Sequence, residues 1–262
     1  MPNKQMSQAV KQTKHGKAAH YYLQAAQTCP PRDKGRTIRD VQPFVEAVWH
    51  FCQAEQWQDA YKLMNDEWLF TDLRRWGRNE QLLEIGKMLE AGKAQVTPSQ
   101  VAHIHNNLGS VSNALGNKQE ALRYYGEALS IMREVGDRGG EGTTLNNLGS
   151  VSNALGNKQK ALRYYREALS IRREVGDRKG EGTTLHNIGI VLLEQHNYRA
   201  GLASILLAKR LYEQVESPYV EYTAEVLDGI RQSLDDKEYA ALLKEVEPQA
   251  QQIVEEALHT VG

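Results

Sequence analysis

The sequence predicts an all-α fold, a solenoid of antiparallel helix hairpins preceded by a helical N-terminal cap. The main observation is an internal repeat, because residues 101–140 and 141–180 are identical at 31 of 40 aligned positions. A fixed period of this size is typical of stacked helix pairs. Turn and cap signals recur with the same period: Gly116-Asn117 suits a tight left-handed turn, and Gly136 followed by Asp137 suits a helix end followed by a helix start.

The residue pattern within each copy distinguishes between the helical repeats of this length. Leu108-Gly109, Ala121, Tyr125 and Ala128 follow the order L-G…A-x3-F/Y-x2-A. This order resembles the tetratricopeptide repeat (TPR). The forty-residue length resembles the subtype found in Pins-type spindle-orientation adaptors and in STAND-type signalling ATPases. The resemblance implies a right-handed solenoid in which Gly109 and Ala121 let the first and second helix of a hairpin approach closely.

Two positions depart from the ordinary repeat. Ser112 and Ser152 stand where an aromatic residue is expected, and Arg133 and Arg173 stand where a proline usually ends the second helix. We therefore expect the additional residues of the longer repeat to extend the second helix and the start of the next hairpin. A third copy aligns more weakly, with Gly201 in place of the first alanine.

Local start and stop signals divide the chain. Thr97 with Gln100 forms a capping box around Pro98, and this signal opens the regular array. Pro248 lies deep in the last helix and should kink or split it. The predicted segments are a polar tail (1–16), a tryptophan-rich, TPR-like helical cap (17–96), three repeats in 97–217 (about 101–140, 141–180 and 181–217) and a degenerate C-terminal capping hairpin (218–262).

The predicted cap contains all the tryptophans and phenylalanines of the chain, between Phe44 and Trp76. At helical spacing such residues usually form a core, and a ligand cage is the alternative. Residues 20–22, 46–60 and 73–77 also resemble the helical region that precedes the repeats of STAND-type ATPases, over about residues 17–92. The phosphate-binding loop of such an ATPase is absent from the sequence. This resemblance therefore implies a sensor module without its ATPase core.

Composition excludes several classes of function. The net charge of −1 argues against a strongly basic nucleic-acid binder, and no apolar run approaches the ~18 residues of a membrane helix. The N-terminus lacks the apolar segment of a signal peptide, and two cysteines without motif spacing suit a cytoplasmic protein with reduced thiols. Residues 1–40 carry eight Lys/Arg against two Asp, whereas residues 221–262 carry three Lys/Arg against ten Asp/Glu. Two solvated ends, or end-to-end attraction between chains, would explain this asymmetry.

The sequence predicts neither an enzyme nor a metal or cofactor site. His103 and His105 are two residues apart on a helix and therefore point to different faces. No catalytic pairing of a nucleophile with a histidine has a motif context. The expected catalytic residues, metal ligands and cofactors are therefore none.

Peptide binding has more support. The TPR resemblance implies that first-helix residues just before Leu-Gly face a concave groove, and Asn107, Asn147 and Asn187 recur there once per repeat. An amide offers donors and an acceptor together and can hold a peptide backbone. Because Asn is a mediocre helix former, its recurrence in mid-helix favours a role over chance, although simple duplication is the alternative. The predicted peptide-binding residues are Asn106, Asn107, Ser110, Asn113, Asn146, Asn147, Ser150, Asn153, His186 and Asn187.

We therefore expect a scaffold that binds a protein or an extended peptide, as an adaptor or sensor module of a bacterial signalling system. The residues His103, Thr143 and Thr183, one turn earlier, would tune specificity. Since the predicted peptide-binding positions lack Lys and Arg, a carboxylate clamp for chaperone C-termini is not expected. The alternatives are self-assembly into homo-oligomers through the solenoid ends and, from another class, an enzyme with an unrecognised site.

Overall fold

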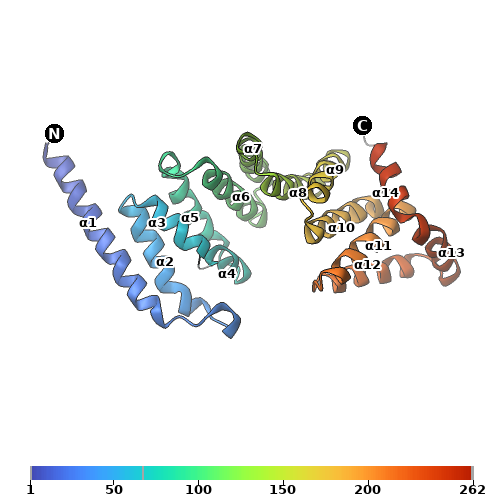
Figure 1. Cartoon of the computed structure of the whole chain (residues 1–262), viewed down its shortest axis with the longest axis horizontal. Coiled ribbons are helices and arrows are strands. Elements are labelled where there is room, and N and C mark those ends of the chain that lie inside the picture. Colours follow the sequence, from blue (N-terminus) through green and yellow to red (C-terminus); the bar gives the residue numbers. More distant parts are fainter. Residues whose placement is uncertain (1, 67, 261–262) are drawn as a thin grey trace. The chain divides into compact units, whose positions relative to one another are not determined.

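All the regular secondary structure is helical in the part of the chain that the computed structural model describes, residues 2–66 and 68–260 (Figure 1). The predicted all-α fold is confirmed. The helices are α1 (Pro2–Ala25), α2 (Ile38–Gln53), α3 (Trp57–Asp66), α4 (Leu69–Arg75), α5 (Asn79–Ala91), α6 (Pro98–Ala114), α7 (Lys118–Val135), α8 (Arg138–Ala154), α9 (Lys158–Glu174), α10 (Arg178–Glu194), α11 (Tyr198–Gln214), α12 (Val220–Ser233), α13 (Asp236–Val246) and α14 (Ala250–His259). Short 3₁₀ turns cover Ala26–Thr28, Arg32–Lys34, Lys93–Gln95 and Glu247–Gln249.

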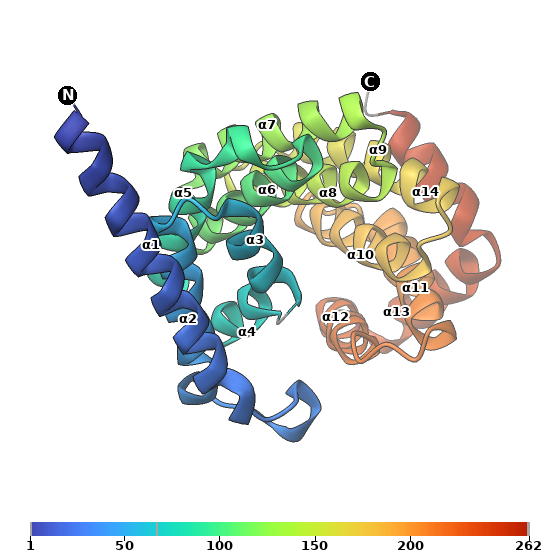
Figure 2. The same ribbon diagram turned by 60° about the vertical axis from the view of Figure 1, so that its left-hand side comes forward.

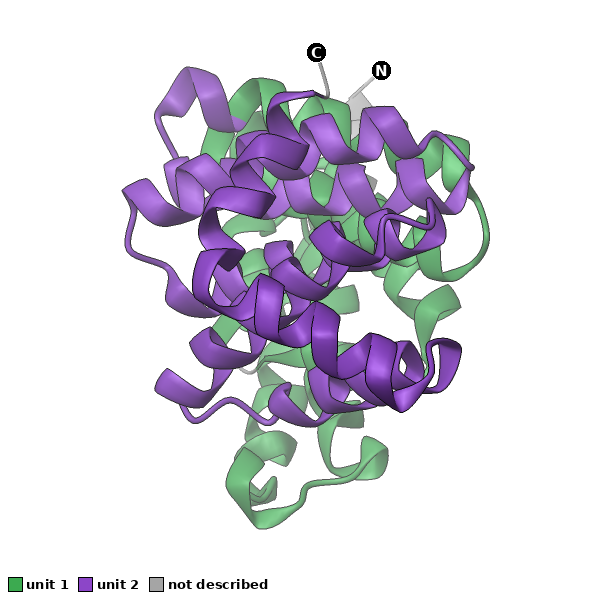
Figure 3. Ribbon diagram, turned by 90° about the vertical axis from the view of Figure 1, so that its right-hand side faces the viewer, with its two compact units in different colours: residues 1–131 green, residues 132–262 purple. Residues whose placement is uncertain are grey.

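The chain forms two compact units, residues 1–131 (unit 1) and 132–262 (unit 2), which are coloured separately in Figure 3. The division falls inside α7 and therefore within the first predicted repeat. The predicted segment boundaries at residues 16, 96 and 217 do not coincide with it and stay a proposal. No helix among the described residues is long and apolar enough to cross a membrane.

In unit 2 the helices pair as hairpins, α8 with α9 and α10 with α11, which lie side by side in Figure 2. The close approach predicted for the glycine is present. A Cβ atom added at Gly149 would lie 2.6 Å from Cδ1 of Tyr165, and that ring is buried. Ala161 is fully buried in the same hairpin. Small residues at these two positions therefore bring α8 and α9 together.

The junctions between hairpins follow the predicted caps. Gly136 and Gly176 have φ angles of 73° and 71°, in the left-handed region. The carboxylates of Asp137 and Asp177 accept hydrogen bonds from the N–H groups of Gly140 and Gly180, both at 2.8 Å. At each junction a glycine thus ends one helix and an aspartate caps the start of the next.

The arginines that replace proline bind buried glutamates across these junctions. Arg133 Nε lies 2.8 Å from Glu141 Oε1, and the second copy repeats the contact between Arg173 and Glu181, also at 2.8 Å. Both glutamates are buried near the start of the following helix. The departure from the ordinary repeat therefore supplies a charged contact that joins consecutive hairpins.

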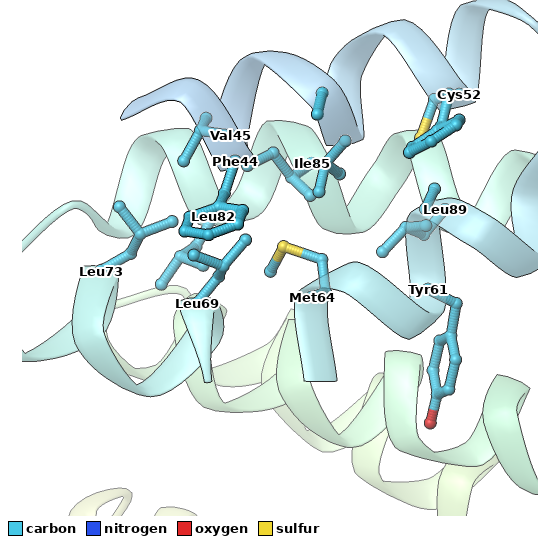
Figure 4. Packing of buried hydrophobic residues seen from close by; sticks show 14 of the residues in the cluster. Phe44, Val45, Cys52, Tyr61, Met64, Leu69, Leu73, Leu82, Ile85 and Leu89 are labelled. Carbon is cyan, nitrogen blue, oxygen red and sulfur yellow. The ribbon is translucent and has the colours of Figure 1, made fainter. Parts of the chain in front are cut away.

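Unit 1 has a core of its own, formed by residues of α1 to α7, part of which is shown in Figure 4. Phe44, Met64, Leu82 and other apolar side chains meet there, whereas the hydroxyl of Tyr61 points out of the cluster. The interpretation of the aromatic residues as core is confirmed for Phe44 and Phe51. It is wrong for Trp68, which is 58% exposed and has a left-handed backbone conformation just before α4.

The two ends of the chain are helical. Residues 2–16, predicted as a polar tail or fraying helix, form the first part of α1, which runs without a break to Ala25. At the other end, α13 stops at Val246, a 3₁₀ turn contains Pro248, and α14 begins at Ala250. The predicted split at Pro248 is confirmed.

Candidate functional site

Two of the predicted peptide-binding residues touch each other across consecutive repeats. In unit 2, Asn187 Nδ2 on α10 donates a hydrogen bond of 3.1 Å to Asn146 Oδ1 on α8. Both side chains are half-buried. The sequence suggested no structural partner for these amides, because the bond joins positions 41 residues apart and arises only when α8 and α10 pack together.

The remaining predicted residues of unit 2 differ in their exposure. Asn147 and His186 are half-buried, and Ser150 is exposed. Asn153 lies near the end of α8, and its Oδ1 is buried without a hydrogen-bond partner among the described residues. We call Asn146, Asn147, His186 and Asn187 the asparagine face.

In unit 1 the equivalent residues Ser110 and Asn113 contact other side chains. Ser110 is buried, and its hydroxyl contacts both Arg74 and Tyr125. Burial raises the pKa of Tyr125 to about 12. Asn113 Oδ1 accepts a 2.6 Å hydrogen bond from Lys118 Nζ at the turn between α6 and α7. Asn113 is therefore used within its own hairpin, whereas Ser110 contacts both its own hairpin and Arg74 on α4.

The neighbouring asparagines of unit 1 lie on α6. Asn106 and Asn107 are both half-buried. Asn107 lines a cavity of only about 20 Å³ next to Met64 and Phe70. This cavity has room for little more than a water molecule.

A larger pocket, of about 520 Å³, opens in unit 2 beside the N-terminal half of α10. Lys179, Thr183 and His186 share one face of α10 by their spacing of three and four residues, and that face lines the pocket. The predicted specificity positions Thr143 and Thr183 are both among its walls. We call this cavity the tyrosine pocket, and it is lined by Thr143, Arg172, Asp177, Lys179, Gly180, Thr183, His186, Tyr212, Tyr219 and Tyr222.

Three tyrosines give the pocket its aromatic wall, and sequence reasoning missed them. Tyr212 is buried and donates a hydrogen bond of 3.1 Å to Thr183 Oγ1. Tyr219 lies between Tyr212 and Tyr222, with ring centroids 5.7 and 5.8 Å away. The available signal was the pair of tyrosines in Tyr219–Tyr222, which follows Pro218 and begins a helix outside the regular repeats.

Basic side chains also line the pocket. Arg172 is only 11% exposed and is held by Asp177 Oδ2 and Thr143 Oγ1, each at 2.6 Å. The ammonium group of Lys179 lies 5.4 Å from the centroid of the Tyr219 ring. Burial lowers the pKa of His186 below its ordinary value, and its Nδ1 has no hydrogen-bond partner in the described part of the chain.

A second group of ionisable side chains lies in unit 1, around His105. Nε2 of His105 is 3.2 Å from Glu90 Oε1, and Nδ1 is 3.4 Å from Glu127 Oε2. One donor atom from each of the three residues lies within 4.8 Å of the others, so they could hold a metal ion. The two ring nitrogens face different carboxylates, however, and this arrangement suits an imidazole paired with two acids. Burial lowers the pKa of His105, and the two carboxylates oppose that effect.

His103 and His105 face different ways, as their spacing predicted. His103 shares a 3.0 Å hydrogen bond with the hydroxyl of Tyr61, whereas His105 faces Glu90 and Glu127. The later copies carry Leu145 and Leu185 where the first has His105. A histidine at a position that carries leucine in the other copies could have indicated this cluster, because a histidine at a core position requires polar partners.

Comparison with known proteins supports the fold and the repeat type. Residues 100–174 match the tetratricopeptide repeat family model. No curated protein sequence matches the chain. The Pins-type and STAND-type resemblances therefore stay hypotheses.

Solved structures of low sequence identity share the fold. Aspartyl phosphate phosphatase F from Bacillus subtilis is 10% identical, with a TM-score of 0.62 over 97% of this chain and 71% of that chain. A Rap protein complexed with Competence and Sporulation Factor is 11% identical, with a TM-score of 0.60 over 95% and 78%. BtubC from P. vanneervenii is 18% identical, with a TM-score of 0.53 over 80% and 92%. At these identities the similarity establishes the helical solenoid architecture and nothing of the chemistry.

Proposed function

We propose that this chain is a scaffold that binds a protein or extended peptide on the asparagine face and in the adjoining tyrosine pocket. The observation that carries the proposal is that His186, which lines a pocket of about 520 Å³, directly precedes Asn187 of the Asn146–Asn187 pair on α10. A surface with paired amides beside an aromatic pocket suits a main chain with a side chain that anchors it.

The amide pair is suited to a peptide backbone. The bond between Asn187 and Asn146 uses one N–H of the first and one lone pair of the second. Each amide retains further donor and acceptor capacity that a peptide N–H and C=O can use. Since the bond also holds the two side chains in place before binding, less rotamer entropy is lost when the peptide arrives.

The finer role that we propose is an adaptor or sensor module of a bacterial signalling system. A solved structure of the same fold is a Rap protein complexed with Competence and Sporulation Factor, and another is a phosphatase from Bacillus subtilis. These likenesses support a partner-binding use of the fold. The forty-residue repeats and the tryptophan-rich cap support the sensor role through their resemblance to STAND-type regions.

The test begins with capture of proteins from source lysate on the wild-type chain and on the double variant Asn146→Ala, Asn187→Ala. We expect a partner that binds the wild type and is lost from the double variant, with affinity reduced by about 1–3 kcal/mol when both are titrated. The melting temperature should hardly change, because the lost hydrogen bond is offset by the better helix propensity of alanine.

Gln159→Ala is the matched control, since Gln159 is an exposed amide on α9. The control should retain full affinity. Identical capture by wild type and double variant would contradict the proposal. A captured partner that is only another copy of this chain, with a molecular mass that rises with concentration, would favour self-assembly instead.

A further inference from the structure

We propose that the tyrosine pocket binds a carboxylate of the partner peptide together with an apolar or aromatic side chain next to that carboxylate. This inference rests on the proposed function and specifies the chemistry that the peptide must carry. It differs from a carboxylate clamp at the asparagine face, because the positive charge lies in the pocket and not on that face.

The charge balance of the pocket favours an anion. Arg172 and Lys179 are positively charged, and Asp177 is the acid that lines the pocket. The Asp177 carboxylate is already occupied, since it accepts hydrogen bonds from Gly180 N–H at 2.8 Å and from Arg172 at 2.6 Å. Because burial keeps His186 neutral near pH 7, the lining carries a net charge of about +1. A single positive charge matches a carboxylate better than a phosphate dianion.

The aromatic wall favours an apolar group beside that anion. Tyr219 and Tyr222 are 42% and 58% exposed, and their rings lie in contact with each other. Exposed tyrosines of this kind gain from covering by a partner, because the ring is apolar while the hydroxyl can still donate a hydrogen bond. The anion and the apolar group would therefore occupy adjacent parts of one cavity, because the ammonium group of Lys179 lies 5.4 Å from the centroid of the Tyr219 ring.

The internal repeat shows that the positive charge is particular to this pocket. Copies one and two are nearly identical, yet Arg172 replaces Met132 and Lys179 replaces Gly139. Two of the few differences between the copies thus add basic side chains to the lining of one cavity.

The backbone leaves room for the buried cation. A Cβ atom at Gly180 would lie 2.7 Å from Arg172 Nε. A glycine at position 180 is therefore what allows Arg172 to lie against the start of α10, where the helix dipole also favours a nearby anion.

The experiment is selection from random heptapeptide libraries on the full chain, with a free C-terminal acid in one library and a C-terminal amide in the other. A third, amidated library contains phosphotyrosine and phosphoserine. We expect the selected peptides to combine a carboxylate with a neighbouring aromatic or aliphatic residue. Enrichment of free acids alone would identify the C-terminal carboxylate as the source, and enrichment of Asp or Glu in the amides would identify a side chain.

Lys179→Ala and Tyr222→Ala test whether the peptides use this pocket. Each should weaken binding of a selected peptide roughly tenfold, as the loss of a hydrogen bond to a charged group or of a stacking contact does. Lys160→Ala, on the exposed side of α9, is the control and should leave binding unchanged. Added salt should weaken binding to the wild type more than binding to Lys179→Ala.

Two outcomes separate this inference from the proposed function. Selected peptides without a carboxylate, or with a preference for phosphate, that still depend on Asn187 would overturn the inference and leave the scaffold role intact. The inference would also fail if Lys179→Ala bound as tightly as Lys160→Ala. No enrichment over the Asn146→Ala, Asn187→Ala variant would overturn both.

Discussion

Arg173 shows how one residue changes the contact between consecutive repeats. Its position is the one where an ordinary repeat has a proline, and in the structure it reaches Glu181 at the start of the next hairpin, 2.8 Å away. Arg178 contacts the same carboxylate at 3.0 Å. Because Glu181 is buried and the arginines are partly exposed, the contact mainly satisfies a carboxylate that would otherwise lack partners. The sequence marked the departure, but the partner became apparent only from the structure.

A single residue, His186, should also make the stability of unit 2 depend on pH. Burial lowers its pKa in the folded chain, so the folded state binds fewer protons than the unfolded state as pH falls below about 6.5. The stability of unit 2 should therefore be fully present above about pH 6.5 and fall below it. Arg172, Lys179 and Asp177 line the same pocket as His186.

The measurement for His186 is urea unfolding at about pH 7.5 and about pH 5.5, on either side of the ordinary histidine pKa. His186→Asn is the natural comparison, because the two preceding copies carry Asn106 and Asn146 at this position. The variant should lose less stability than the wild type on acidification. An equal loss in both would show that other groups cause the pH dependence.

At the scale of the helix pair, contact between α8 and α9 depends on the absence of one methyl group. Gly149 lies against the buried ring of Tyr165, whereas a Cβ atom added at Gly126 on α7 would meet no neighbouring atom within 4 Å. Glycine is thus required at the first position and is only a weak helix former at the second.

The two positions should respond oppositely to the same substitution. Gly149→Ala should destabilise the chain by about 1–3 kcal/mol, because the buried ring has to shift. Gly126→Ala should stabilise it by about 1 kcal/mol, through helix propensity alone. Thermal and urea unfolding of both variants test this, and a Gly149→Ala variant as stable as wild type would contradict the packing that we describe.

At the scale of the whole molecule, stability is divided between separate cores. The core of unit 1 includes α2 to α6, and the core of unit 2 includes residues of α9, α10, α11 and α14. In a repeat protein each hairpin interacts with its neighbours only, so stability is close to a sum of local terms. Disturbance of one core should therefore spread little along the chain.

Ala161→Leu tests this division. The added volume should overpack the α8–α9 hairpin, where Ala161 is fully buried, and cost about 1–3 kcal/mol. Amide hydrogen exchange should increase in peptides from 141–214 and stay unchanged in peptides from 38–91. Ala154→Leu, at an exposed position in the last turn of α8, is the control. Faster exchange throughout the chain would indicate a single cooperative unit.

The sequence by itself determined the features that depend on neighbouring residues. The helix boundaries at Thr97, Asp137, Asp177 and Pro248 follow from local capping and from the missing N–H of proline, and all are present in the structure. The repeat period also specified the hairpin fold, since each copy carries the small and large residues that pack its own two helices. These relations act over a few residues or within one hairpin, where sequence spacing fixes geometry.

Only the tertiary structure decided which polar residues meet. The Asn146–Asn187 bond, the cluster of His105 with Glu90 and Glu127, and the tyrosine wall of the pocket all join residues from different hairpins or helices. Such contacts depend on how far one hairpin is shifted and rotated against the next. That displacement results from the packing of many buried side chains together, and the spacing of residues along the sequence does not encode it directly.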